Sequence, residues 1–330
     1  MRLVITLLFF GFILSGYSQG CSDAGFCTMG AMKPDQNYSR RLAIKLRSIE
    51  FNYYRGTSLI SPIIYAANID FNLALTDRSS LQVKLPYQWI KGNLGENAGL
   101  GDISLSYTTN LKTTNKWSFN GTIGTKIPTN DANAKVNNEF TNGQAAPLHM
   151  YYQTSLGSYD GIAGLSMINQ KWLLATGIQI AFTENGNEFV WGDFPGYPGL
   201  GSTEAELAEG REYVRRYNKG IHLKRGTDVM FRLERNFKFT NFNFTFGALS
   251  IYRITKDNVL IPATPQRGEH REDLDGTLGL AFSVIGTFGY QFDVNSSIKL
   301  IQGIKLVDRD VNPDGLTRSE VFSLSYVYKF

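Results

Sequence analysis

The segment VFSLSYVYKF, residues 321–330, alternates between two kinds of side chain. One parity carries large apolar side chains, namely Phe322, Leu324, Tyr326, Tyr328 and Phe330. The other parity carries mostly small or polar side chains, namely Ser323, Ser325, Val327 and Lys329. A period of two places the two sets on opposite faces of a β-strand, so the segment predicts a strand with one apolar face.

The same alternation recurs along much of the chain. It is visible at 69–75, 81–89, 103–108, 117–123, 242–246 and 277–284. Each segment has the length of a strand, and each again has one apolar and one polar face. The sequence therefore predicts an all-β protein.

Alternation alone does not distinguish a soluble β-sandwich from a transmembrane β-barrel, whose apolar face meets lipid and whose polar face lines a lumen. Aromatic residues at the predicted strand ends, such as Trp89 and Trp172, favour the barrel because they suit interfacial girdles. The polar parity also carries charges suited to a wet lumen, at Lys84, Asp102, Lys126, Asp160, Arg232 and Glu234. These charges predict either a constriction that selects solutes or ion pairs that brace a narrow barrel.

The predicted connections alternate between short and long. Short links fall at 76–80, 111–115, 169–170, 236–241 and 293–297, and longer ones at 55–61, 91–100, 128–147, 184–225, 255–275 and 308–318. A closed antiparallel barrel of about twelve strands, with short periplasmic turns and long extracellular loops, gives this pattern. The last strand would then pair with the first to close the barrel. The segment 148–168 is either one long strand or a strand with a kink at Gly157.

The N-terminal segment 1–20 has the layout of a secretory signal peptide, with Arg2 before an apolar run. Lipid attachment at Cys21 is the alternative. We expect residues 21–40 to form a periplasmic or lumenal segment and 41–330 to form the barrel. Cys21 and Cys27 predict a disulfide in an oxidising periplasm, with soft-metal binding as the alternative. We hypothesise that this segment folds into the lumen and narrows it.

The loop 184–225 differs in composition from the rest of the chain. Its first half holds the aromatic residues Phe189, Trp191, Phe194 and Tyr197. They predict either an apolar path for a ligand or a packing cluster on the barrel rim. Its second half predicts a short helix, with Ser202 as the N-cap and Gly220 at the end.

Composition disfavours several classes of function. A net charge of +4 gives no sign of nucleic-acid binding. The three histidines, His149, His222 and His270, lack zinc spacing, and no nucleophile-elbow motif is present. His149 lies close to Ser155 in the sequence, so a lipid hydrolase stays open as a third possibility. We expect no enzyme activity, no cofactor and no metal.

Several short motifs resemble, in order, segments of the meta-pathway phenol-degradation outer-membrane family. They are GLGDISLSYTTNL at 99–111, TKIPTND at 125–131, SLGSYDGIAGLS at 155–166 and QKW at 170–172. The resemblance implies a small-molecule channel in the outer membrane of a Gram-negative bacterium. The aromatic end at Tyr326, Tyr328 and Phe330 also resembles the signal that the barrel assembly machinery recognises.

We therefore expect a single monomeric outer-membrane β-barrel. Its most favoured role is transport of small solutes, with hydrophobic or aromatic molecules as candidates. The alternative is a non-transport component of a secretion or surface-assembly complex. The expected partners are outer-membrane lipid, the barrel assembly machinery and a small-molecule solute of unknown identity.

Overall fold

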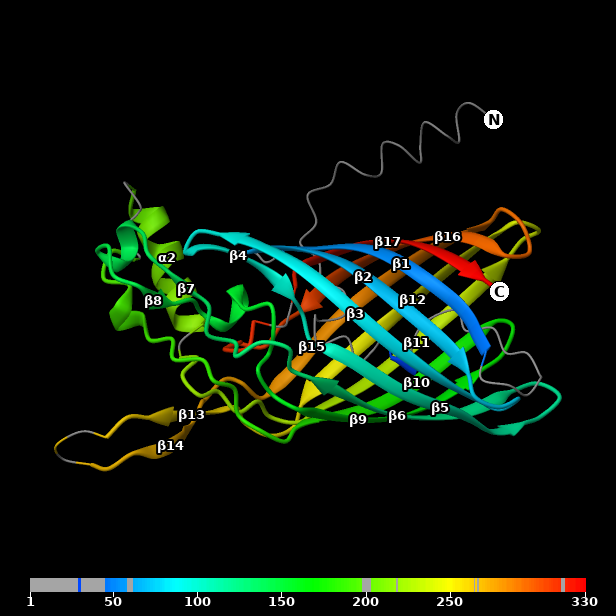
Figure 1. Cartoon of the computed structure of the whole chain (residues 1–330), viewed down its shortest axis with the longest axis horizontal. Helices are drawn as coiled ribbons and strands as arrows, with labels where there is room; N and C mark the ends of the chain where they lie inside the picture. Colours follow the sequence, from blue (N-terminus) through cyan, green and yellow to red (C-terminus); the bar gives the residue numbers. More distant parts are fainter. Residues whose placement is uncertain are drawn as a thin grey trace.

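The structure, a computed structural model, describes residues 29–30, 45–57, 62–197, 203–217, 219–263, 265, 267–315 and 318–330. The predicted signal peptide, Cys21, Cys27 and Ser202 lie outside these residues. The described residues are dominated by one antiparallel sheet that closes into a barrel (Figure 1).

The barrel wall consists of long strands joined mostly to their sequence neighbours. The strands are β1 (Lys45–Thr57), β2 (Ile63–Ala74), β3 (Ser79–Gly92), β4 (Gly95–Leu100), β5 (Ile103–Thr113), β6 (Ser118–Ile127), β9 (Asp160–Ile168), β10 (Trp172–Ala181), β11 (Asp228–Lys238), β12 (Phe242–Arg253), β15 (Gly279–Gln291), β16 (Ser296–Val307) and β17 (Glu320–Lys329). The sheet has 13 strands, but β4 and β5 both pair with β3 and share one position in the wall. Twelve wall positions result, which confirms the predicted strand number.

The final strand closes the barrel against the first. β1 pairs with β17 from Ser48 opposite Lys329 to Thr57 opposite Glu320. The backbone N–H of Phe330 extends the pairing by donating to the carbonyl oxygen of Arg47 at 3.0 Å. The predicted closure is therefore confirmed, and it leaves neither strand as an open edge.

The barrel is apolar on the outside and largely polar on the inside. Phe246 on β12 is 54% exposed, whereas its neighbour Thr245 is 4% exposed and faces the interior. The same outward parity holds for Phe242 and Phe244 and, on the last strand, for Tyr326 and Tyr328. A soluble sandwich would bury these faces, so the exposed apolar wall identifies a transmembrane barrel of the outer-membrane type.

The connections differ in length at the two ends of the barrel. The short turns 75–78, 114–117, 169–171, 239–241 and 292–295 lie at one end, and the loops 128–159, 182–227, 254–278 and 308–319 lie at the other (Figure 1). The predicted alternation is largely confirmed. The loop expected at 91–100 is wrong, because β3 and β4 continue the wall as a hairpin with its tip at 93–94.

The segment 148–168 is mostly loop rather than one long strand. It holds the 3₁₀ helix η4 (Met150–Tyr152), and β9 begins only at Asp160. Gly157 between them has a φ of +68°, and a Cβ there would lie 2.7 Å from that of Ala132. Glycine is therefore required where the chain turns toward β9.

The long loops carry short elements of their own. They are β7 (Lys135–Val136), η3 (Glu139–Thr141), β8 (Ala146–Pro147), η5 (Trp191–Asp193), α2 (Glu204–Arg216), β13 (Asn258–Ile261) and β14 (His270–Asp273). Helix α2 confirms the predicted helix, but it ends at Arg216 with Tyr217 as its C-cap, so the expected end at Gly220 is wrong. Its N-cap is Thr203, whose hydroxyl accepts from the N–H of Glu206 at 3.3 Å. The side chain of Glu206 accepts in return from the N–H of Thr203 at 2.9 Å, which makes a capping box. Among the described residues, no helix is long and apolar enough to cross a membrane.

Candidate lumen site

A cluster of buried charges lies at the loop end of the barrel interior. It consists of Asp160, Arg225, Asp228, Arg253, Asp257 and Asp314, and we refer to these six residues as the ion-pair layer. All six are buried. Three of them are at the ends of wall strands and three are in the long loops, so the layer ties the loops to the wall.

Arg253, the last residue of β12, is the centre of this layer. Its guanidinium donates to both carboxylate oxygens of Asp228, at 2.7 and 2.8 Å. It also donates to Asp257 at 2.5 Å and to Asp314 at 2.8 Å. One fully buried arginine therefore joins β11, β12 and the loops 254–278 and 308–319, with a bidentate contact of the strongest type.

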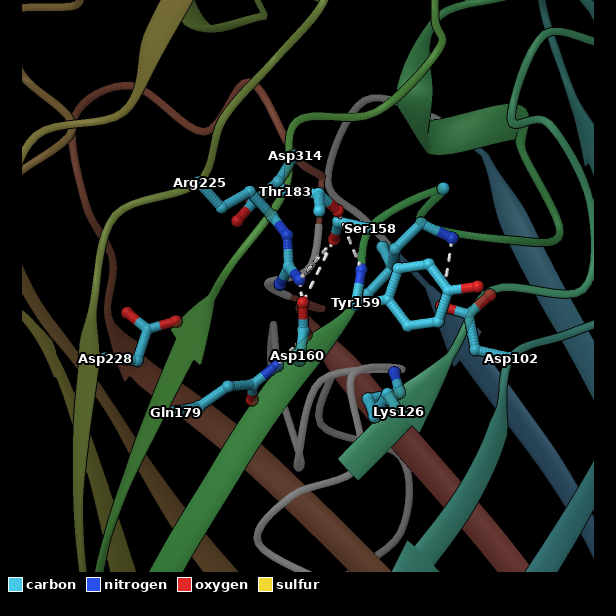
Figure 2. Close-up of polar contacts among 12 residues, drawn as sticks. Asp102, Lys126, Ser158, Tyr159, Asp160, Gln179, Thr183, Arg225, Asp228 and Asp314 are labelled. Carbon is cyan, nitrogen blue, oxygen red and sulfur yellow. Dashed lines mark hydrogen bonds and ion pairs between the residues drawn. The ribbon is translucent and has the colours of Figure 1, made fainter. Parts of the chain in front are cut away.

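Arg225 and Asp160 form the second part of the layer. The guanidinium of Arg225 reaches down from the loop 182–227 to the carboxylate of Asp160 at the start of β9, and Asp314 lies on its other side (Figure 2). Arg225 also donates to the hydroxyl of Ser158 at 3.1 Å, and Gln179 of β10 donates to Asp160. The carboxylate of Asp160 is thus held by one loop and one wall strand.

Asp102 fixes a segment of loop that folds over the lumen. One carboxylate oxygen accepts from the hydroxyl of Ser155 at 2.5 Å, and the other accepts from the backbone N–H of Leu156 at 3.0 Å. The side chain of Lys126 lies beneath Asp102 on the wall (Figure 2). We call residues 153–157 the inward segment. Between it, Asp102, Lys126 and Asp314 lies a cavity of about 20 Å³, which is room for about one water molecule.

The lumen wall below this layer has two chemically different sides. The side made by β17, β1, β2, β3, β5 and β6 is lined mostly by amide, hydroxyl and carboxylate groups, including Asn52, Asn68, Asp70, Gln82, Ser106, Thr108, Asn120, Thr122, Ser323 and Ser325. The opposite side, made by β9, β10, β11, β12 and β15, carries the apolar side chains Ile162, Leu173, Ala175, Met230, Leu249 and Ile285, together with the buried polar residues Arg232, Glu234, Ser283 and Thr287. We refer to these as the polar wall and the apolar wall.

Two residues of the N-terminal segment lie inside this lumen. Met29 packs with the apolar wall and is 2% exposed. The backbone N–H of Gly30 donates to the side-chain oxygen of Gln82 on the polar wall at 2.8 Å. The pair therefore spans from one wall to the other.

The predicted lumen charges all face the interior but fall into separate groups. Asp102, Lys126 and Asp160 lie together at the loop end. Arg232 and Glu234 form an ion pair with each other on β11, where Arg232 lies opposite Leu249 of the apolar wall. Lys84 lies between Asp70 and Ser104 on the neighbouring strands and is half-buried.

Sequence reasoning missed most of the ion-pair layer. Arg253 and Asp228 share the inward parity of their strands, so alternation extended to the strand ends would have found them. Arg225, Asp257 and Asp314 lie in loops, where no periodicity indicates which side chain turns inward.

The loop aromatic residues form a packed cluster rather than a visible path. Phe189 and Phe194 are completely buried, and Trp191 stacks on Tyr197 with ring centroids 5.4 Å apart. The cluster also contains His149, Tyr151, Tyr213 and Tyr217, and we call these eight residues the aromatic cap. The packing alternative of the sequence-based prediction fits this arrangement.

His149 is a buried member of the aromatic cap. Burial lowers its pKa to about 3, against the opposing field of Asp314, so the imidazole is neutral at ordinary pH. Its Nδ1 accepts from the backbone N–H of Tyr151 at 3.3 Å. Among the described residues Ser155 bonds to Asp102 and Gly157 instead of to His149, so the pair does not form a nucleophile and base.

Comparison with solved structures gives a similar barrel. The COG4313 outer membrane channel from Pseudomonas putida F1 matches with a TM-score of 0.54 and 13% sequence identity, over 90% of this chain and 99% of that one. At this identity the match supports the fold alone. No protein-family model and no curated protein sequence matches the chain.

Two other solved structures are less similar and carry no argument of their own. The Ralstonia pickettii toluene transporter TbuX matches with a TM-score of 0.43 and 9% identity, over 94% of this chain and 95% of that one. The CymD monoaromatic hydrocarbon channel matches with a TM-score of 0.39 and 10% identity, over 96% and 94%.

Proposed function

We propose that this protein is an outer-membrane channel for small molecules, closed at its extracellular end by the ion-pair layer and the inward segment. The observation that carries the proposal is the set of ion pairs that hold the long loops to the barrel wall at one end of the lumen. Loop residues Arg225 and Asp314 are held to wall residues Asp160 and Arg253 by ion pairs, whereas the wall itself is held by backbone pairing. Loops can therefore move without breaking the barrel.

The polar contacts at the lumen end favour a closed state that can open. Each pair consists of charges that are well solvated when exposed, so separation into an aqueous lumen costs far less than separation into a dry core. In the closed state, the lumen charges hold the loops to the barrel wall. Once the loops move, Asp102, Lys126 and Asp160 would form a mixed-charge patch on one side of the lumen that a solute passes.

Solutes with an aromatic or other apolar part suit the proposal. The apolar wall offers such solutes contact inside an otherwise polar lumen. The sequence motifs at 99–111, 125–131 and 155–166 support a relation to the meta-pathway phenol-degradation family. We extend the proposal to secretion by the signal peptide 1–20, a Cys21–Cys27 disulfide and recognition of Tyr326, Tyr328 and Phe330 by the barrel assembly machinery.

A docking role is a second candidate because one loop extends away from the barrel. Strands β13 and β14 form a hairpin that projects beyond the barrel end (Figure 1). Its strands bear the charges of Arg271, Glu272 and Asp273, and a projecting charged hairpin suits contact with a partner.

Liposome swelling distinguishes the two candidates. Vesicles that contain the purified barrel should swell in a small sugar such as arabinose, and faster when Asp314→Asn removes the ion pair between the loop 308–319 and Arg253. Protein-free vesicles give the baseline. Folded barrels that swell no faster than this baseline in either form would contradict the channel and favour docking.

A further inference from the structure

We infer that the place occupied by Met29 and Gly30 is the solute-binding site of the lumen, and that it binds small uncharged amphipathic molecules in competition with this pair. The ligand class is an apolar ring or short alkyl group that carries a hydroxyl or amide group. The inference rests on the proposed channel function and names the chemistry of its solute.

The two walls define what the site can bind. On one side Ile162, Met230, Leu249 and Ile285 present buried apolar side chains. The only charges on β11 at this level, Arg232 and Glu234, are buried and paired with each other beside Leu249. A ring or alkyl chain gains free energy there by leaving water. A sugar has no apolar part of comparable size, so it gains little at this wall and passes the open lumen without binding there.

On the other side the groups are hydrogen-bonding but mostly uncharged. Gln82 accepts from Gly30, and its amide nitrogen donates to the carboxylate of Asp70 at 3.0 Å. The hydroxyls of Thr108 and Thr122 lie 2.8 Å apart beside Gly30. A single hydroxyl or amide of a ligand would find both donors and acceptors here.

Met29 and Gly30 reproduce this ligand chemistry from within the chain. The methionine side chain is a flexible apolar group, and it fills the space between the apolar wall and Gly124 of β6. The glycine amide supplies the polar group to Gln82. A solute with the same two parts would make the same contacts and would have to displace the pair.

Gly30 packs so closely against the polar wall that a larger residue at this position should displace Met29 and Gly30 from the lumen. Gly30 has a φ of +52°, and a Cβ at this position would overlap Thr108 and Thr122. Gly30→Val should therefore expel the pair from the lumen, while the barrel strands keep their own pairing. Heat-dependent gel mobility would show that the variant barrel is folded.

Thiol labelling would measure the competition. The protein would carry Met29→Cys together with Cys21→Ser and Cys27→Ser, and a charged methanethiosulfonate would label Cys at position 29 in detergent solution. We expect 2-phenylethanol to raise the labelling rate in a saturable manner, toward the rate that Gly30→Val gives without any solute. Glycerol, which lacks the ring, should leave the rate unchanged.

Direct binding would test the walls themselves. Calorimetric titration of the Gly30→Val protein with 2-phenylethanol should show binding, and the further change Leu249→Gln should weaken it at least about fivefold. Val321→Gln makes the same kind of change at a lumen position on β17, outside the apolar wall, and should have little effect. Equal weakening by both variants, or no binding at all, would overturn the inference.

The outcomes also separate this inference from the channel proposal. Displacement of the pair by 2-phenylethanol without any solute flux in liposomes would support the site and count against the channel. Flux without displacement, or equal labelling with glycerol and 2-phenylethanol, would overturn the site and leave the channel standing.

Discussion

Arg253 and Asp314 are 61 residues apart in the sequence, yet their side chains meet at 2.8 Å inside the closed barrel. Arg253 ends a wall strand, whereas Asp314 belongs to the loop 308–319. Together with the pairs Arg225–Asp160 and Arg253–Asp257, this contact joins the long loops to the wall at the loop end of the lumen.

Arg253→Gln should strongly destabilise the loop end of the barrel. The change would leave the buried carboxylates of Asp228, Asp257 and Asp314 without their shared cation, a loss of about 3–5 kcal/mol for a buried pair. Urea unfolding of the folded barrel in detergent would measure it. Arg215→Gln on α2 removes an exposed cation that pairs with Asp310 and is the matched control, expected to change the free energy of unfolding little.

Asp102→Ala should free the inward segment without unfolding the barrel. It removes the acceptor of both the Ser155 hydroxyl and the Leu156 amide, which leaves the segment without these two bonds to the wall. We expect limited proteolysis to cut within 153–157 in the variant and to spare it in the parent. Identical cleavage patterns would show that Asp102 does not hold the segment.

The aromatic cap should weaken in acid because of His149. Its pKa is about 3 in the folded protein and about 6.5 when exposed, so between these values the unfolded state holds one more proton. Stability therefore falls as the pH drops from 6.5 toward 3, by about 1.4 kcal/mol for each pH unit, and is unaffected by this group above that window.

Fluorescence of Trp191 would follow the cap, since its ring lies 6.4 Å from that of His149. The emission of Trp191 is obtained by subtracting the spectrum of Trp191→Phe from that of the same protein with Trp191 intact. We expect it to change between pH 6.5 and 3 in the parent and to stay flat in His149→Phe. If the Trp191 emission does not change with pH in either protein, protonation of His149 does not open the aromatic cap.

Phe246→Lys should destabilise the barrel in a bilayer because it puts a charge on the apolar outer face. The expected cost is about 2–4 kcal/mol if the residue is near the bilayer midplane. Val294→Lys, in the exposed turn 292–295, is the control and should cost little. Unfolding in lipid vesicles would measure both, and equal costs would contradict the assignment of the outer wall to lipid.

The strands were predictable because successive side chains along each strand alternate between the lumen and the outer face. Thr245 and Phe246 differ by one position, and this is enough to place one inside and the other against lipid. Lys84, Arg232 and Glu234 share the parity of the inner face of their strands. Pairing of the last strand with the first followed from the need to remove edges.

The closure of the lumen could not be predicted in the same way. Asp257 and Asp314 become partners of Arg253 only through the paths of two loops, and loop paths have no period. Gly315, next to Asp314, has a φ of +63° and lies against the Tyr151 ring, where a side chain would not fit. A single glycine in a loop does not reveal such a turn from the sequence. The apolar wall was missed because it breaks the polar-inside pattern at scattered positions such as Met230 and Leu249.

The most direct test of the closed-channel account is single-channel conductance of the folded protein in a planar bilayer, with and without Asp314→Asn. The variant keeps Asp228 and Asp257 as partners of Arg253 but weakens the ion pair that joins the loop 308–319 to the wall at Arg253. We predict brief or small openings in the parent and larger, longer openings in the variant. A folded variant that conducts no better than the parent would contradict the claim that these ion pairs close the lumen.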